Sequence, residues 1–258
     1  MKYIAFLLLA VSLVIIPPAV SQDANYWLYK TQSDYSNGSY SLALQDIDEY
    51  LGMNSSDTWA WSFKANLLRN MERYSEAVDS FDQLILLDGA NAQAYNDRAL
   101  LLSGGMRQNE EALKSLETAL QINPNDANFW FNKGMILENM KRYDEALEAY
   151  RQAAALNSSL DRAWYRQGLL LATAGSYNES LPLLDKAIEL NSKNADAWKT
   201  KGEVLMGLNS TEEAQSCFEK AAALEPSNRD FQVQKSREKA QDGAEKGPEK
   251  TIEFNRSM

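Results

Sequence analysis

Aromatic residues recur along this chain at an almost constant interval. The interval is 34 residues, lengthened once to 35, between successive members of the series Trp27, Trp61, Tyr95, Trp130, Trp164 and Trp198. Four residues beyond each aromatic residue the chain carries a small side chain, in the series Thr31, Ala65, Ala99, Gly134, Gly168 and Gly202. A fixed period of this length is typical of repeat arrays, in which each unit buries its apolar face against its neighbours.

A second apolar pattern occupies the other half of each period. Small residues recur at Ala43, Ala77, Ala112, Ala146, Ser180 and Ala214, and bulky ones follow four positions later at Ile47, Phe81, Leu116, Tyr150, Leu184 and Phe218. Residues three or four apart share one face of a helix, so each period predicts two short amphipathic helices. The predicted repeats are residues 24–57, 58–91, 92–126, 127–160, 161–194 and 195–228. Ser75, Asp144 and Asn178 each precede an acidic residue and are predicted N-caps of second helices.

The series Trp130, Gly134, Tyr143, Ala146, Tyr150 and Ala153 resembles the tetratricopeptide repeat family. The resemblance extends over six units, residues 24–228. It implies an all-α fold, a right-handed α-solenoid of helix–turn–helix units whose first helices line a concave groove. Members of this family are mostly binding scaffolds that hold extended peptides or helices in that groove. The signature residues are expected to form the core, and they carry no information about the ligand.

The two ends of the chain differ from the repeats. Residues 1–21 combine a basic start at Lys2, an apolar run and small residues before position 22, which predicts a secretory signal peptide. An uncleaved N-terminal membrane anchor is the alternative, since residues 3–22 carry no charge. Either way we expect the repeats outside the cytoplasm, secreted or anchored to the cell envelope. Residues 229–240 predict a polar capping helix, and residues 241–258 a mobile tail.

Charge and composition narrow the class of function. The formal net charge is −10, and an acidic surface repels nucleic-acid phosphates and anionic lipids, so we expect neither as a partner. The chain has no histidine and a single cysteine, Cys217. These counts exclude an intrachain disulfide, a Ser–His or Cys–His nucleophile pair and a histidine-bearing metal site. The sequence therefore predicts a protein or peptide partner and no catalytic residue, metal or cofactor, and it leaves the partner's identity and the oligomeric state open.

Under the family geometry, fixed positions of the first helices face the groove. The aromatic, amide and arginine side chains predicted to contact a bound segment there are Trp59, Asn66, Arg69, Asn96, Asn128, Phe131, Asn132, Arg162, Tyr165 and Arg166. Amides can pair with a peptide main chain, and aromatic and arginine anchors carry much of the binding energy at interfaces. The alternative is that these side chains are simply solvated.

Two members of this set carry sharper hypotheses. Trp59 stands outside the 34-residue series, so it is either a ligand anchor or a packing residue against the first repeat, near Tyr35. Asn132, Arg162 and Arg166 resemble three members of the carboxylate clamp of chaperone-binding family members. The clamp is incomplete, because Asn96 and Leu100 stand where its first lysine and asparagine are expected.

Glycosylation and lateral assembly complete the hypotheses. The acceptor pattern for N-linked glycans occurs at Asn37, Asn54, Asn157, Asn178 and Asn209, all predicted to lie in turns, and again at Asn255 in the tail. A second functional hypothesis is a structural subunit of an envelope or secretion assembly. In that role, lateral contacts between solenoids matter more than the groove.

Overall fold

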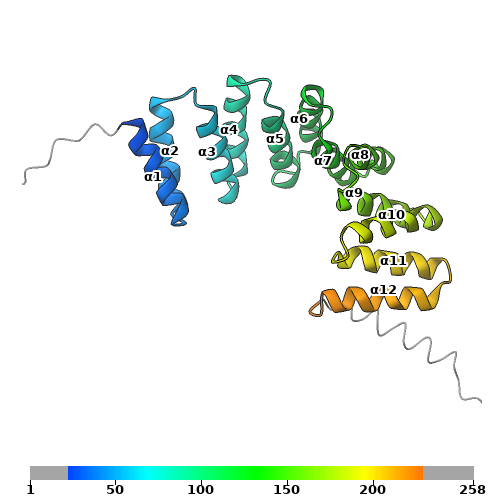
Figure 1. Ribbon diagram of the computed structural model, residues 1–258. Coiled ribbons are helices and arrows are strands. Elements are labelled where there is room, and N and C mark those ends of the chain that lie inside the picture. The colour runs from blue at the N-terminus through cyan, green and yellow to red at the C-terminus, as the bar shows by residue number, and fades with distance from the viewer. Residues whose placement is uncertain (1–22, 229–258) are drawn as a thin grey trace, which may run out of the picture. The chain divides into compact units, whose positions relative to one another are not determined.

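The computed structural model describes residues 23–228, so the predicted signal segment, capping helix and tail lie outside the described residues. Between residues 23 and 228 the chain forms twelve α-helices and no strand, and the helices follow one another in pairs (Figure 1). Their bounds are α1 Ala24–Ser36, α2 Tyr40–Met53, α3 Thr58–Asn70, α4 Tyr74–Leu87, α5 Ala92–Gly104, α6 Asn109–Ile122, α7 Ala127–Asn139, α8 Tyr143–Leu156, α9 Asp161–Thr173, α10 Tyr177–Leu190, α11 Ala195–Gly207 and α12 Thr211–Leu224. Each predicted repeat range holds one helix pair, and the fold is the all-α solenoid expected from the sequence.

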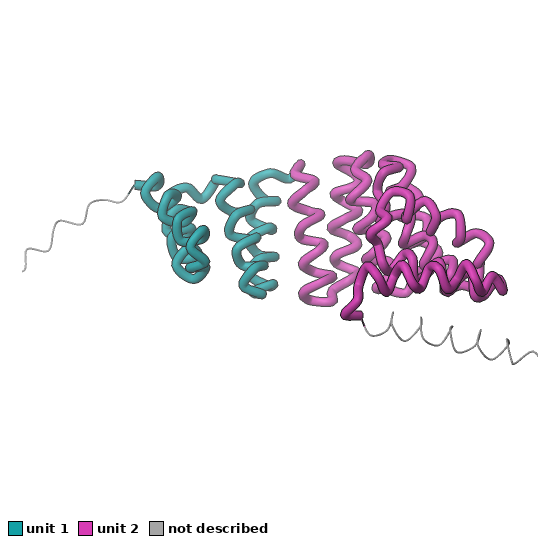
Figure 2. Tube along the Cα trace, turned by 60° about the horizontal axis from the view of Figure 1, so that its bottom comes forward, with its two compact units in different colours: residues 1–89 teal, residues 90–258 magenta. Residues whose placement is uncertain are grey.

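The chain divides into two compact units, residues 1–89 and 90–258 (Figure 2). In the first unit α1 packs on α2, α2 on α3, and α3 on α4. In the second unit each helix from α5 to α12 packs on the next one along the chain. Of the helices between residues 23 and 228, none is both long and apolar enough to cross a membrane.

The small residues of the sequence pattern lie where the two helices of a pair approach each other. Ala43, Ala77, Ala112, Ala146, Ser180 and Ala214 are all 0% exposed, as are Thr31, Ala65 and Ala99. In later repeats the same place is taken by glycine, and a Cβ on Gly134 would lie 2.5 Å from the ring of Tyr150. A Cβ on Gly202 would likewise lie 2.6 Å from the ring of Phe218. A glycine in these repeats therefore leaves room for a bulky partner on the second helix.

The recurring tryptophans are half-buried rather than fully buried, and four of them bind the first helix to the turn before it. The indole Nε1 donates to a backbone carbonyl six residues earlier: Trp61 to Ser55 at 2.8 Å, Trp130 to Pro124 at 2.8 Å, Trp164 to Ser158 at 3.0 Å and Trp198 to Ser192 at 3.0 Å. Buried tryptophan commonly satisfies its N–H in this way.

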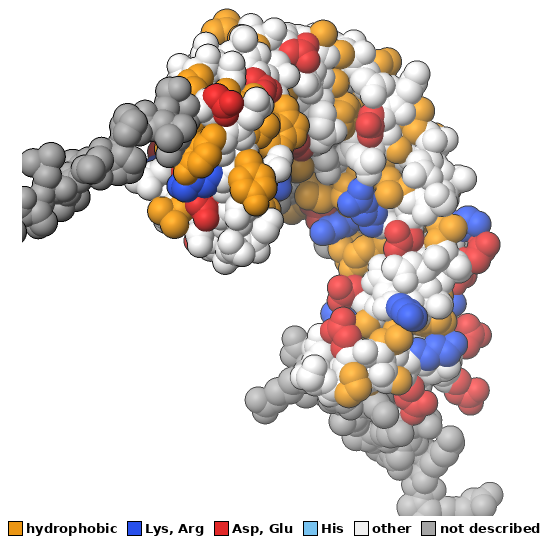
Figure 3. Space-filling model, turned by 60° about the vertical axis from the view of Figure 1, so that its left-hand side comes forward, with side chains coloured by type: hydrophobic (Ala, Val, Ile, Leu, Met, Phe, Trp, Pro, Cys, Tyr) orange, Lys and Arg blue, Asp and Glu red, His pale blue; other side chains and the backbone are white. Residues whose placement is uncertain are grey.

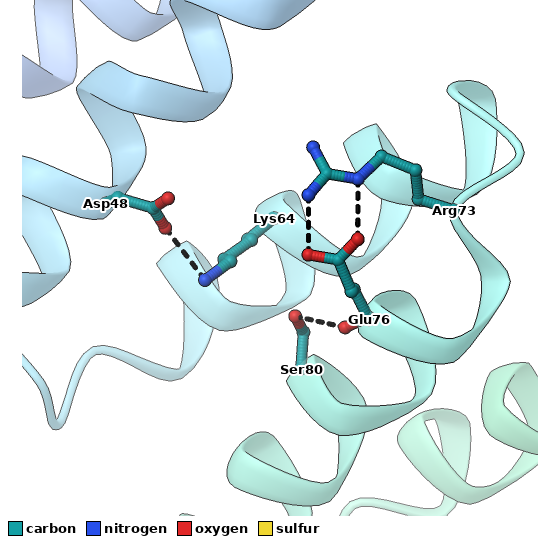
Figure 4. Close-up of polar contacts among 5 residues, drawn as sticks. All are labelled: Asp48, Lys64, Arg73, Glu76 and Ser80. Atoms are coloured by element: carbon teal, nitrogen blue, oxygen red, sulfur yellow. Dashed lines mark hydrogen bonds and ion pairs between the residues drawn. The ribbon is translucent and has the colours of Figure 1, made fainter.

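A lysine three residues after the tryptophan links successive repeats, and we call this arrangement the indole–lysine ladder. Its members are Trp61, Lys64 and Asp48; Trp130, Lys133 and Glu117; and Trp198, Lys201 and Asp185. Each ammonium lies 5.3–5.8 Å from the indole centroid and pairs with an acid on the preceding second helix. Figure 4 shows Lys64 of α3 reaching Asp48 of α2 at 2.7 Å.

The N-cap predictions for the second helices were wrong by two residues. Helices α4, α8 and α10 begin at Tyr74, Tyr143 and Tyr177, so Ser75, Asp144 and Asn178 lie inside the first turn. In two of these helices the N-cap is an arginine whose guanidinium binds the glutamate three residues later, as Arg73 binds Glu76 in Figure 4. This ion pair takes the place of a side-chain cap, and it keeps an acid near the positive end of the helix dipole.

Candidate protein-binding surfaces

The first unit carries a row of aromatic side chains along α1 and α3, which we call the aromatic row: half-buried Tyr35 and Phe63 and exposed Trp59. The rings of Trp59 and Phe63 stack with centroids 5.3 Å apart, and Phe63 meets Tyr35 edge-on at 5.3 Å. Trp59 keeps 46% of its surface exposed. Trp59 therefore combines both interpretations of the sequence, since it packs toward Tyr35 through Phe63 and still offers a large aromatic surface to solvent.

The position of Trp59 follows from how α3 begins. Asp57 caps the helix, and its Oδ1 accepts the backbone N–H of Trp59 at 2.9 Å and that of Ala60 at 3.2 Å. The other oxygen, Oδ2, accepts the hydroxyl of Tyr50 at 2.6 Å, and this hydrogen bond raises the pKa of Tyr50. Trp59 and Phe63 lie four residues apart and so share one face of α3. The cap thus fixes the aromatic row at the start of the helix.

Polar side chains continue this face of α3 toward its C-terminus. Asn70 donates to the hydroxyl of Tyr35 at 3.3 Å, which ties the row to a second contact between α3 and α1. Asn66 donates to the carbonyl of Ser62 on its own helix at 2.8 Å, and its Oδ1 remains available as an acceptor. Arg69 is exposed in the last turn of α3.

Three predicted contact residues of the second unit are interior. Asn96 is 4% exposed, Phe131 4% and Asn132 9%, and the Nδ2 of Asn132 donates to the Oδ1 of Asn96 at 2.7 Å. This hydrogen bond lies where α7 contacts α5, and the Nδ2 of Asn96 donates to the Oδ1 of Asp97 at 3.0 Å. The prediction that these three residues are exposed in the groove is wrong, because Asn96 and Asn132 lie between α5 and α7. Phe131 packs on Tyr150 of α8 and lies under Arg162. The three residues stabilise the stack of first helices.

Arg162, at the start of α9, is exposed, and its guanidinium contacts two side chains of α7. Its guanidinium carbon lies 4.4 Å from the centroid of the Phe131 ring, and its Nη2 donates to the Oδ1 of Asn128. Within residues 23–228 no carboxylate lies within 4.0 Å of this guanidinium. Arg162 is therefore an ordered cation that lacks an acidic partner in this part of the chain.

Arg166, one turn further along α9, is neutralised. Its Nη1 lies 3.1 Å from the Oε1 of Glu138 on α7, while the Oε2 of Glu138 accepts the hydroxyl of Tyr150 at 2.8 Å. Burial, together with the charge of Glu138, raises the pKa of Tyr150 far above its usual range. Asn132, Arg162 and Arg166 therefore do not form a shared carboxylate site. Asn132 is buried and Arg166 is paired with Glu138, so of the three only Arg162 can bind an acidic group.

A shallow hollow of about 390 Å³ lies beside the C-terminal half of α9. Its lining residues are Glu138, Tyr143, Leu169, Leu170, Thr173 and Ala174. Tyr143 is 51% exposed, and Leu169 is half-buried. Sequence reasoning did not select this hollow, although the apolar Leu169 on the solvent-facing side of a first helix was its signal. Tyr165 lies on the same helix and is half-buried, and burial raises the pKa of its hydroxyl.

A second hollow, of about 300 Å³, lies in the first unit between α3 and α4. It is lined by Trp61, Lys64, Glu76, Asp79, Ser80 and Gln83. Figure 4 shows that several of these groups are already engaged, since Lys64 pairs with Asp48, Arg73 binds Glu76, and the Ser80 hydroxyl donates to the Glu76 carbonyl. The hydrogen bonds from Arg73 hold the pKa of Glu76 below its usual value. These contacts stabilise the helix pair and engage Lys64, Glu76 and Ser80 within it.

The predicted glycan acceptors lie at helix ends with one exception. Asn37, Asn157 and Asn209 are exposed in turns, and Asn54 ends α2 with intermediate exposure. Asn178 lies in the first helical turn of α10 and not in the loop before it, because that helix begins at Tyr177. It is nevertheless exposed. Glycan attachment at all five sites stays a prediction.

No cluster of three acidic, cysteine or histidine side chains suited to a metal occurs between residues 23 and 228. Cys217 is buried beside Phe218, and burial raises the pKa of its thiol. A raised pKa keeps the thiol protonated and weakly nucleophilic.

Comparison with known proteins identifies the repeat. Models of the tetratricopeptide repeat match residues 60–95, 108–141, 127–160 and 171–236. No curated protein matches the sequence.

Solved structures share the fold at low sequence identity. YrrB, a TPR protein with an unusual peptide-binding site, is 22% identical, with a TM-score of 0.60 over 74% of this chain and 97% of that one. PilW, titled a type IV pilus biogenesis factor, is 17% identical, with a TM-score of 0.68 over 81% of this chain and 97% of its own. PilF of Pseudomonas aeruginosa is 18% identical, with a TM-score of 0.68 over 83% and 97%. The family matches together cover more than half of the sequence, and the helices of the fold are paired as the repeat requires. The chain therefore belongs to the tetratricopeptide repeat family.

Proposed function

We propose that this protein is an exported interaction scaffold that binds an extended segment of another protein along the faces of its first helices. The observation that carries the proposal is the aromatic row, in which Trp59 is 46% exposed although the repeat does not require an aromatic residue at its position. The space-filling view shows exposed hydrophobic side chains among charged ones on the surface of the molecule (Figure 3). Partly exposed aromatic side chains of this kind are frequent binding hot spots.

The aromatic row is suited to binding because it is already ordered. Trp59 stacks on Phe63, and Phe63 packs on Tyr35, so the rings have few alternative rotamers to lose when a partner arrives. Preorganised side chains lower the entropic cost of association. The amide of Asn66 lies one helical turn beyond Phe63 and supplies a polar group for a peptide main chain.

The binding proposal can be tested with a displayed library of random 12-residue peptides. The library is selected on the full chain, and the retained peptides are then measured on Trp59→Ala and on Leu86→Ala. Leu86 is a matched control, because it is 78% exposed but lies on the second helix α4. We expect Trp59→Ala to weaken retention about tenfold and Leu86→Ala to leave it unchanged. Equal retention by Trp59→Ala, or no enrichment on the wild type, contradicts the proposal.

Export rests on residues 1–21, whose sequence has the layout of a signal peptide. Mass spectrometry of the protein from its own cells is expected to give an N-terminus near residue 22 in a fraction outside the cytoplasm. An intact N-terminus in the membrane fraction would favour the anchor. A full-length pool confined to the cytoplasm would contradict export.

One observation favours the structural-subunit alternative. The second helices of the first unit expose large leucines, with Leu42 on α2 at 48% and Leu86 on α4 at 78%. If lateral contacts dominate, Leu86→Ser should abolish the cross-linked assemblies that the wild type forms in its envelope, while Trp59→Ala should leave them intact. The opposite pattern supports binding along the first helices.

A further inference from the structure

We infer that the hollow between α3 and α4 binds the ammonium group of a lysine side chain from a partner protein, over the ring of Trp61 and beside the carboxylate of Asp79. This site goes beyond the proposed function, because it lies away from the aromatic row. Trp59 and Trp61 are two residues apart, which places them about 200° apart around the axis of α3. The two surfaces therefore lie on different sides of the same helix.

The sixth repeat shows how such a cation is held. Lys220 of α12 places its Nζ 4.2 Å from the centroid of the Trp198 ring, and the ladder residue Lys201 lies 5.8 Å from the same centroid. Lys201 is paired with Asp185 on the preceding second helix. A paired ladder lysine therefore does not prevent a second ammonium from lying closer to the indole. The cation is attracted by the negative face of the ring.

The second repeat has the same indole and ladder lysine but lacks the second ammonium. Gln83 follows Trp61 by 22 residues, as Lys220 follows Trp198 by 22. Gln83 and Trp61 both line the hollow of about 300 Å³, so the place that Lys220 fills in the sixth repeat is open in the second. Ligand sites begin at about this volume, which suits one side chain rather than a longer segment.

The acidic partner for the cation is Asp79. It lines the hollow, is exposed, and has no hydrogen-bond or ion-pair partner between residues 23 and 228. The corresponding acid of the fourth repeat, Glu148, accepts a hydrogen bond from Gln152 at 2.8 Å. In the described second repeat no hydrogen bond joins Gln83 to Asp79, whose side chain is one methylene shorter than that of glutamate. Asp79 is thus the carboxylate that remains for a ligand.

The charge of the first unit favours a basic partner. Residues 23–89 contain 4 lysines and arginines and 11 aspartates and glutamates, a net charge of −7. Around the hollow, Lys64 is paired with Asp48 and Arg73 with Glu76, so these four charges cancel (Figure 4). The remaining carboxylate leaves the hollow negative, and the field of the whole unit attracts a cation toward it.

The test is a proton–nitrogen NMR titration of the full chain labelled at its tryptophan indoles. The probe is N-acetyl-lysine methylamide, and N-acetyl-norleucine methylamide is the uncharged comparison. The Trp61 resonance is assigned by its absence in Trp61→Phe. We expect the lysine probe to shift this resonance with saturation in the millimolar range and to leave that of Trp198, which Lys220 already covers, in place. An equal response to the norleucine probe, or an equal shift of Trp198, overturns the inference.

Three variants test the groups assigned to the hollow. Asp79→Asn should weaken binding of the lysine probe about fivefold. Gln83→Lys, which copies the sixth repeat, should fill the hollow and abolish the shift. Glu72→Gln is the matched control, because it removes one exposed carboxylate of the same unit outside the hollow and should weaken binding less than about twofold. Equal weakening by Asp79→Asn and Glu72→Gln, or an unchanged shift in Gln83→Lys, contradicts the site.

Trp59→Ala separates this inference from the proposed function. The variant should retain fewer peptides and keep the full response of Trp61 to the lysine probe. If it loses that response as well, the site over Trp61 is not independent and the inference fails. If no peptide is enriched on the wild type while Trp61 still responds, the proposed function fails and this site stands. The unshifted indole resonances of the other tryptophans confirm that each variant is folded.

Discussion

The side-chain amide of Asn132 donates to that of Asn96 at 2.7 Å, and both residues are buried between α7 and α5. A direct amide–amide bond in a packed interface positions one first helix against another at a fixed register. It also explains why polar residues recur on a face that the sequence alone assigns to ligand contact. Buried amides of this kind are favourable only while they remain paired.

Replacing Asn132 with alanine should therefore affect stability more than binding. The substitution leaves the Oδ1 of Asn96 without its donor, and we expect a loss of about 1–3 kcal/mol in the free energy of unfolding. Urea titration followed by circular dichroism measures the loss. Asn128→Ala is the control, because Asn128 is exposed and its removal should cost less than about 0.5 kcal/mol. A stable Asn132→Ala protein that no longer binds peptides would contradict this structural role.

The contrast between the amide pair and the small residues shows how far the sequence could predict this molecule. Ala65, Ala99 and Ala146 follow a strict period and are fully buried, because close approach of two helices tolerates only small side chains. The exposure of Asn96 and Asn132 depends instead on how near the next first helix lies. That distance is a property of the stack, and no spacing within one repeat determines it.

The ion pair that neutralises Arg166 could not be predicted from the sequence for the same reason. Its partner Glu138 lies 28 residues earlier, on a different first helix, and the sequence offers many acids at comparable separations. Trp59, in contrast, could be selected from the sequence because it departs from the period. Two of the three N-caps were misplaced because an arginine–glutamate pair at i, i+3 in α4 and α8 takes the place of a side-chain cap.

Gly134→Ala should destabilise the second unit. The new Cβ would lie 2.5 Å from the ring of Tyr150, a fully buried side chain that has no room to move. Overpacking of this kind costs about 1–3 kcal/mol, measured by urea unfolding. Gly104→Ala, at the end of α5 with nothing within 4 Å of the added Cβ, is the matched control and should leave stability unchanged or slightly raise it. Equal effects of the two substitutions would contradict the close packing of α7 on α8.

Pro182→Ala should stabilise the second unit. Pro182 lies inside α10, where it supplies no N–H for the carbonyl of Asn178 four residues earlier. Restoring that hydrogen bond should raise the free energy of unfolding by about 1–3 kcal/mol, visible as a higher urea midpoint. Pro226→Ala, in the turn after α12, offers no such gain and serves as the comparison. An unchanged midpoint in Pro182→Ala would mean that the helix already accommodates the proline without cost.

Asp46 should make the first unit sensitive to pH. It is 1% exposed, and burial raises the pKa of its carboxyl above the usual value, although the ion pair with Lys30 opposes the shift. Because the folded chain binds this proton more tightly than the unfolded chain does, the group adds stability as the pH falls from neutral through its folded pKa. Unfolding curves between about pH 7 and pH 4 should show the wild type gaining stability relative to Asp46→Asn.

A pH profile of Asp46→Asn that runs parallel to that of the wild type would contradict this prediction, because it would mean that the pKa of the Asp46 carboxyl is not raised in the folded chain.

The indole–lysine ladder is interrupted at one junction of the second unit, and the interruption has a consequence for how salt acts on the protein. Where α7 and α11 carry lysine, α9 carries Gln167, which is 3% exposed and donates to the carbonyl of Tyr150 at 3.2 Å. Dissolved ions screen the charged bridges from α7 to α6 and from α11 to α10, but a buried neutral amide does not respond to them. Rising ionic strength should therefore weaken the contacts of α7 with α6 and of α11 with α10, and leave the contact of α9 with α8 unchanged. These two helices carry Tyr143, Arg162 and Leu169, so we expect this part of the surface to keep its shape at salt concentrations that weaken the neighbouring helix contacts.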